Sequence, residues 1–146
     1  MAIFSFLSKP YNKINALIFS RGSQFEVGDS ISKEGMVGLP FHPANVLDGD
    51  PKMRAKTLTL SGDGGFMTAL WDCTEGRFMW YFKCDEVVHI LEGEVIVTVD
   101  GKTERLVKGS VAFFPIGTVS EWHVPHYVFK LFSHRNPTPT AKRLFG

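Results

Sequence analysis

From residue 55 onward, short runs of β-favouring residues alternate with turn signals, and this pattern constrains the fold more than any other feature. The runs read KTLTL, FMTALWD, RFMWYF, EVVHIL, VIVTV, TERLV, VAFFP, EWHV and VFKLF. Clusters such as SGDGG, CTEG, EGE, KGS and PHY stand between the runs and are typical of turns. Since no helical period intervenes, the pattern predicts an all-β fold with at least seven strands in an antiparallel sandwich or barrel.

The dipeptide Asp100-Gly101 makes the sharpest local prediction. It separates VIVTV from TERLV, and a two-residue type I′ turn needs positive φ at both of its central positions. Glycine adopts positive φ without steric cost, and Asp is among the residues that tolerate it. We therefore predict a β-hairpin centred on this pair.

The chain divides into an N-terminal extension at 1–54, a barrel at 55–135 and a tail at 136–146. Up to about Arg21, apolar residues recur at three- and four-residue intervals with a break at Pro10, which predicts two short helical pieces. Glycines and prolines punctuate the rest of the extension, which favours an irregular segment packed on the barrel.

Composition excludes several classes of partner. Sixteen Lys and Arg against fifteen Asp and Glu leave a net charge of +1, which is not the basic surface that nucleic acid or an anionic membrane attracts. No run approaches the roughly 20 apolar residues that cross a bilayer. Two cysteines are too few for a disulfide scaffold, and no signal-peptide pattern is present. We therefore expect a cytoplasmic protein without a nucleic-acid or membrane partner.

Two segments resemble the motifs of a known superfamily. The first reads GRFMWYFKCDEVVHILEG, from Gly76 to Gly93, and the second reads GSVAFFPIG, from Gly109 to Gly117. They resemble the two cupin motifs, and in particular the small single-barrel group that includes the (S)-ureidoglycine aminohydrolase cupin domain and the ethanolamine-utilisation cupin. The resemblance implies a single jelly-roll-like cupin β-barrel whose two motifs line one cavity.

Metal-binding cupins supply four ligands from these motifs, and this chain retains one of them. Glu86 matches the motif Glu. The motif histidines fall instead on Trp80 and Phe82, or on Met79 and Tyr81, and on Ser120. Because a single carboxylate does not hold a transition metal, we expect no metal cofactor at the usual cupin site. The alternative is a relocated site that combines Glu86 with His123 or His126.

Strand parity selects the candidate site residues. If Val88 and Ile90 face the barrel interior, Glu86 does too, where it is a candidate general acid or base. Lys130 is the candidate cationic anchor for a carboxylate or zwitterion. The motif strands add candidate ligand-binding walls: Trp80, Tyr81 and Trp122. Each has a structural alternative, namely an internally satisfied Glu, a Lys that extends to the surface, and aromatic core packing.

Three functions fit these residues. The first is a small-molecule-binding cupin, with or without metal-independent catalysis, for a small polar ureido, amino or sugar-like compound, a class that rests on the resemblance. The second is a non-catalytic ligand sensor or structural dimer module, in which Phe82 and Met79 plug the cavity and internal hydrogen bonds hold Glu86. The third is a metal-dependent cupin with the relocated site. We also expect a homodimer, because pairing would cover edge strands and an apolar outer sheet.

Overall fold

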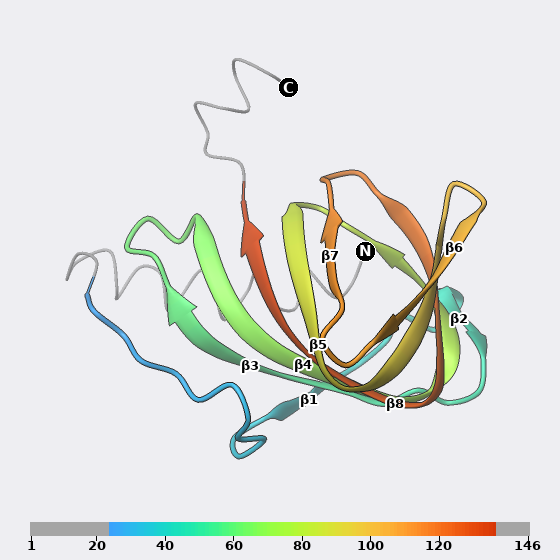
Figure 1. The fold of residues 1–146 in the computed structure, drawn as a ribbon, viewed down its shortest axis with the longest axis horizontal. Coiled ribbons are helices and arrows are strands. Elements are labelled where there is room, and N and C mark those ends of the chain that lie inside the picture. Colours follow the sequence, from blue (N-terminus) through green and yellow to red (C-terminus); the bar gives the residue numbers. More distant parts are fainter. Residues whose placement is uncertain (1–23, 137–146) are drawn as a thin grey trace.

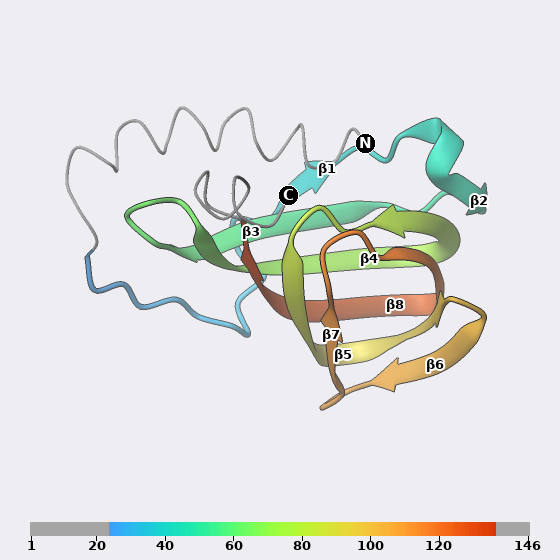
Figure 2. The same ribbon diagram turned by 90° about the horizontal axis from the view of Figure 1, so that it is seen from above.

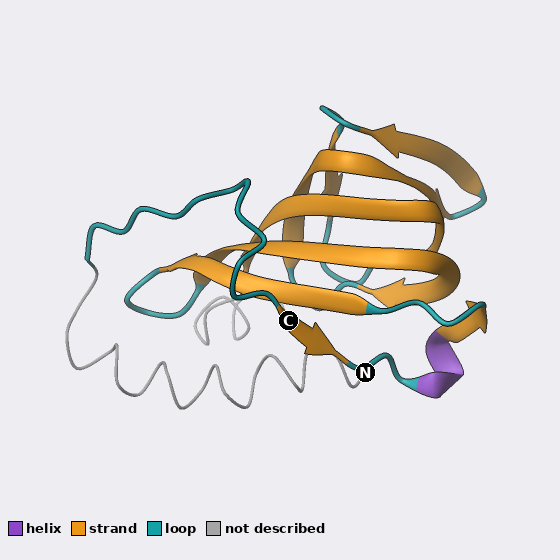
Figure 3. Cartoon of the chain, turned by 90° about the horizontal axis from the view of Figure 1, so that it is seen from below, coloured by secondary structure: helices purple, strands orange, loops and turns teal. Residues whose placement is uncertain are grey.

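β-Strands make up nearly all of the regular structure. The computed structural model describes residues 24–136, and Figure 3 shows them as strands joined by loops, with a short 3-10 helix beside β2. The elements are β1 (Val37–Leu39), η1 (Pro43–Asn45), β2 (Val46–Asp48), β3 (Met53–Leu60), β4 (Phe66–Tyr81), β5 (Asp85–Val99), β6 (Lys102–Val107), β7 (Val111–Phe114) and β8 (Val119–Arg135). The all-β prediction is confirmed. The helical pieces predicted before residue 22 lie outside the described residues, as does most of the tail.

The strands form one antiparallel sheet that curls into a barrel (Figure 1). Its strand order is β1-β3-β4-β8-β5-β6, with β2 paired to β4 and β7 paired to β5. Two strands pair with the same edge of β5. Its residues Glu86–His89 pair with β7, and Glu94–Val99 pair with β6. In Figure 2, β3, β4, β8 and β5 lie side by side, and β6 continues the curve. This arrangement agrees with the predicted jelly-roll-like barrel.

Three strands are longer than the sequence pattern predicts. β4, β5 and β8 continue through CTEG, EGE and PHY, so the turns predicted at these three segments are wrong. The pairing instead shifts register between Thr74 and Gly76 in β4 and around Gly93 in β5. A β-bulge of this kind bends a strand without ending it. The bends let each long strand contribute to both halves of the barrel.

The hairpin predicted at Asp100-Gly101 is confirmed. Val99 at the end of β5 pairs with Lys102 at the start of β6. The two turn residues have φ values of 49° and 77°, both positive as a type I′ turn requires. The local sequence was sufficient because the conformational demand falls on two adjacent residues.

The core lies inside the barrel and is rich in aromatic rings. Six of its buried side chains, which we call the aromatic cluster, are Trp71, Phe78, Trp80, Phe82, Phe114 and Trp122. Neighbouring rings in the cluster have centroids 4.4 to 6.5 Å apart, the range in which aromatic pairs stabilise beyond simple burial. The aromatic cluster therefore determines how much of the barrel interior remains for a ligand.

Strand pairing and one lysine are among the contacts that attach residues 24–54 to the barrel. β1 pairs with β3, and β2 pairs with β4. The Lys33 ammonium lies 4.9 Å from the ring centroid of Tyr127 and 4.8 Å from that of Phe129, and it also pairs with Glu92. These contacts fasten the segment to β5 and β8.

Among residues 24–136, no helix has the length and hydropathy that a membrane span requires.

Candidate functional site

Glu86 and Lys130 form an ion pair inside the barrel. Glu86 lies on β5 with the buried Val88 and Ile90 on the same face, as strand parity predicts. Lys130 lies on β8, and its Nζ donates a hydrogen bond of 2.9 Å to Glu86 Oε1. Each residue is only 2% exposed, so bulk water does not compete for either charge. The structure thus brings these two predicted site residues together.

Three aromatic rings surround the ammonium group of Lys130. Its Nζ lies 5.0 Å from the centroid of Trp71, 4.9 Å from Trp122 and 5.0 Å from Phe132. A cation over the face of a ring is attracted by the ring quadrupole, and more strongly when water is excluded. The rings and Glu86 together hold the lysine inside the barrel, so the alternative of a lysine that extends to the surface is wrong.

The aromatic residues predicted as cavity walls lie on opposite faces of the sheet. Trp80 and Trp122 face inward. The Trp122 indole donates to Ser120 Oγ at 3.0 Å, and that hydroxyl donates to the Trp80 carbonyl at 3.0 Å. Tyr81 follows Trp80 on β4, faces outward and is 40% exposed, so it does not reach the interior. Trp71, which sequence reasoning did not select, packs against both inward tryptophans.

Phe82 and Phe114 complete the aromatic cluster. Their rings stack with a centroid distance of 4.4 Å and an interplanar angle of 4°. Phe114 also lies 5.9 Å from Trp122. Met79, the other residue predicted to plug the interior, alternates with the buried Trp80 and lies on the opposite face of β4. Phe82 therefore packs on Phe114 inside the barrel, whereas Met79 does not join them.

A pocket of about 410 Å³ opens on the inner face of β5, β6 and β7. Val97 and Phe114 belong to the buried core, and Val99, Leu106 and Ala112 pack against it, which places the pocket on the inside of the sheet. Its lining consists of Val97, Val99, Asp100, Lys102, Glu104, Leu106, Ala112, Phe113 and Phe114. None of the predicted site residues is in this lining. The alternation of VIVTV was the available signal, because it already indicated one apolar face on this strand.

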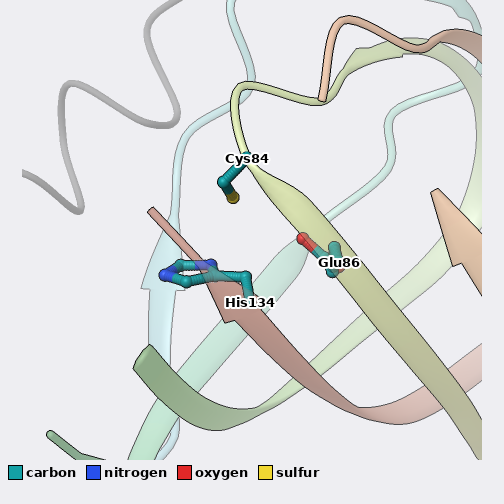
Figure 4. A group of neighbouring side chains, drawn as sticks. All are labelled: Cys84, Glu86 and His134. Carbon is teal, nitrogen blue, oxygen red and sulfur yellow. The ribbon is translucent and has the colours of Figure 1, made fainter. Parts of the chain in front are cut away.

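Glu86 also belongs to a group of three potential metal ligands. The Cys84 sulfur, a Glu86 carboxylate oxygen and a His134 ring nitrogen all lie within 4.8 Å of one another. Figure 4 shows these side chains near one another, with Cys84 on the loop before β5, Glu86 on β5 and His134 near the end of β8. His123 and His126, the residues expected in a relocated metal site, do not join this group. His126 is exposed, and His123 alternates with inward-facing residues of β8.

Both cysteines are buried thiols, and this predicts their reactivity. Desolvation raises the pKa of Cys73 and of Cys84 to about 12, so on the order of one thiol in ten thousand is ionised at pH 8. We expect iodoacetamide to label neither cysteine in the native protein and both after unfolding in urea. Mass spectrometry of the digested protein measures the labelling. Rapid labelling of Cys84 in the native state would contradict this prediction.

Comparison with known proteins places the chain in a family. The family model of the EutQ-like cupin domain matches residues 60–132, whereas no curated protein matches the chain. A Salmonella typhimurium protein assigned as ethanolamine utilization protein Q is 26% identical, with a TM-score of 0.53 over 59% of this chain and 71% of that one. The Clostridium difficile EutQ protein is 22% identical, with a TM-score of 0.54 over 59% of this chain and 64% of that one.

A third solved structure aligns over more of this chain. It is a DUF861-family protein of unknown function from Pseudomonas syringae pv. tomato, 20% identical, with a TM-score of 0.66. The alignment covers 73% of this chain but only 46% of that one, so the likeness is one of fold. The family-model match includes both motif segments, 76–93 and 109–117, and both Glu86 and Lys130. The chain therefore belongs to the family of EutQ-like cupin domains.

Proposed function

We propose that this cupin binds a small amphipathic molecule in the pocket of β5, β6 and β7. The observation that supports the proposal is the pocket itself, because about 410 Å³ of mainly apolar lining falls within the range of small-molecule sites. The floor consists of Val97, Val99, Leu106 and Phe114, which suit an aliphatic or aromatic body. The buried Phe114 is held by its stack on Phe82, so this part of the floor is rigid.

The rim of the pocket supplies the polar contacts. Asp100 and Glu104 bring carboxylates to the edge of the pocket. The Lys102 Nζ lies 3.2 Å from Glu104 Oε1. An amino or ureido group donates hydrogen bonds, so it complements two carboxylate acceptors. A sugar needs polar partners over most of its surface, and the apolar floor does not offer them. The proposed ligand therefore joins an apolar body to an amino or ureido end.

The proposal assigns binding and no chemical step. Glu86, the predicted catalytic residue, is not part of the pocket lining. It is buried and paired with Lys130, which lies under Trp71 and Trp122. The carboxylate is thus paired inside the protein, and catalysis by Glu86 stays a prediction.

A second candidate function, a non-catalytic structural module, is also favoured by specific observations. It predicts a plugged interior and an internally satisfied Glu86. The stack of Phe82 on Phe114 and the bond from Lys130 to Glu86 supply both features. Val111 exposes its apolar side chain on the outer face of β7, at 65%. This exposure supports the homodimer expected from the sequence, which stays a prediction.

A thermal-shift panel separates the two functions. The panel contains hexylamine, phenethylamine, butylurea, phenylurea and methyl glucoside, each with the full-length protein. A ligand at a hundred times its dissociation constant stabilises the folded state by about 2.7 kcal/mol. We expect stabilisation by the amines or ureas and none by the glucoside. A flat response to all five compounds would contradict the binding proposal and leave the structural module.

Two neighbouring residues of β6 provide a matched test of where the ligand binds. Leu106 lines the pocket, whereas Val107 points to the other face of the strand. Leu106→Trp fills the pocket with a large ring. We therefore expect it to weaken the apparent affinity for the active compound at least tenfold, as measured from the thermal shift. Val107→Trp should leave that affinity unchanged. Equal affinities for the two variants would place the ligand elsewhere.

A further inference from the structure

The start of β5, the residue just before it and the end of β8 bring three chemically different metal ligands to one buried position. Glu86 and His134 are direct partners in the β5–β8 ladder, and both side chains are buried on the inner face. Cys84 precedes Glu86 by two residues, and it is fully buried. We propose that Cys84, Glu86 and His134 together bind one divalent first-row transition-metal ion, such as zinc or cobalt, through sulfur, oxygen and nitrogen.

The distances leave room for an ion at the centre of the group. The three ligand atoms lie within 4.8 Å of one another. Around a tetrahedral ion with metal–ligand bonds of about 2.0–2.3 Å, neighbouring ligand atoms lie about 3.3–3.8 Å apart. Side-chain adjustments of about 1 Å therefore close the site without moving the strands. The three protein donors would leave one position of a four-coordinate ion for water or another ligand.

The donors match the preferences of a borderline-soft ion. Thiolate and imidazole together favour zinc, cobalt or nickel over magnesium or calcium, which prefer oxygen alone. The Cys84 thiol releases its proton to solvent when the sulfur–metal bond forms, so binding one metal ion yields one proton.

Lys130 fits the same arrangement as an orienting residue. Its ammonium binds Oε1 of Glu86 at 2.9 Å, and the carboxylate has a second oxygen for the metal. Hydrogen bonds of this kind orient metal-binding carboxylates in many sites. The site therefore differs from the one expected with His123 and His126, and of that expectation it keeps only Glu86.

Cobalt titration of the full-length, reduced protein tests the proposal, because a thiolate–Co²⁺ bond produces an absorption band in the near ultraviolet. We expect about one equivalent of Co²⁺ to bind and to produce this band. Cys84→Ser should abolish the band. Cys73→Ser is the matched control, since Cys73 is equally buried but lies outside the group, and it should retain the band.

Histidine variants and an X-ray measurement complete the test. His134→Gln should weaken Co²⁺ binding at least about tenfold, whereas His123→Gln should not change it. Absence of Co²⁺ binding, or an unchanged band in Cys84→Ser, would overturn the proposal. If a variant does not fold, zinc K-edge absorption of the unmodified protein with one equivalent of Zn²⁺ decides. One sulfur at about 2.3 Å supports the site, and a shell without sulfur overturns it.

Discussion

Gly93→Ala is expected to lower the free energy of unfolding by more than about 4 kcal/mol, a cost seen only for substitutions with a specific structural cause. Gly93 has a φ of 72°, in the left-handed region. A Cβ at this position would lie 2.8 Å from the carbonyl carbon of Tyr127 and still closer to its oxygen. Those atoms belong to the backbone of β8, so they cannot move aside as a flexible side chain would. Urea denaturation followed by tryptophan fluorescence measures the loss.

Gly101→Ala is the matched control for this prediction. Gly101 has a similar φ of 77°, but a Cβ there meets nothing within 4 Å. The control therefore carries the cost of the left-handed conformation alone, about 1–2 kcal/mol. The difference in unfolding free energy between the two variants isolates the collision of the added methyl group with the backbone of β8. Equal losses in the free energy of unfolding would mean that the close approach at Gly93 contributes nothing. If Gly93→Ala is found only in the insoluble fraction while Gly101→Ala is soluble, that result would agree with the expectation.

Lys130→Met is expected to lower the free energy of unfolding by about 3–5 kcal/mol, because it leaves the buried carboxylate of Glu86 without its charged partner. In the native pair, Lys130 Nζ lies 2.9 Å from Glu86 Oε1, and both side chains are almost fully shielded from water. Methionine keeps much of the volume and the contacts with Trp71 and Trp122, so the loss reports the charge and not a cavity. The measurement is urea denaturation in the presence of EDTA, which removes any contribution from a bound metal.

The double variant Glu86→Met/Lys130→Met tests the cause of that loss. Replacing a buried ion pair by apolar side chains of similar size is often neutral or stabilising, whereas breaking the pair is costly. We therefore expect the double variant to be more stable than Lys130→Met by at least about 2 kcal/mol. If the double variant is instead as unstable as the single one, packing around Lys130, and not the unpaired carboxylate, accounts for the loss.

Features that depend on adjacent residues could be predicted from the sequence. The hairpin at Asp100-Gly101 follows from the conformational demands of two residues, and the structure has positive φ at both. The inward direction of Glu86 follows from alternation with Val88 and Ile90, since side chains of a strand alternate between its two faces. The two motif segments were sufficient for the fold class because the family resemblance rests on several residues at set spacings.

Features that depend on a partner strand could not be predicted in the same way. Glycine and acidic residues in CTEG and EGE are typical of turns, but the structure places them at bulges inside β4 and β5. Whether such a segment turns or bulges depends on whether a neighbouring strand continues to pair beside it. β8 does so along both β4 and β5, and the isolated sequence does not contain that information.

The candidate sites divide along the same line. The sequence by itself determined that Glu86 shares a strand face with Val88 and Ile90, and it left the direction of Lys130 open between the interior and the surface. Only the tertiary structure decided that Lys130 meets Glu86 and that His134 pairs with Glu86 in the ladder. It also decided that the pocket lies beside β6 and β7 and not beside the predicted tryptophans. The physical reason is that direction is a local property of a strand. Register and curvature, in contrast, are set by pairing between residues far apart in the chain.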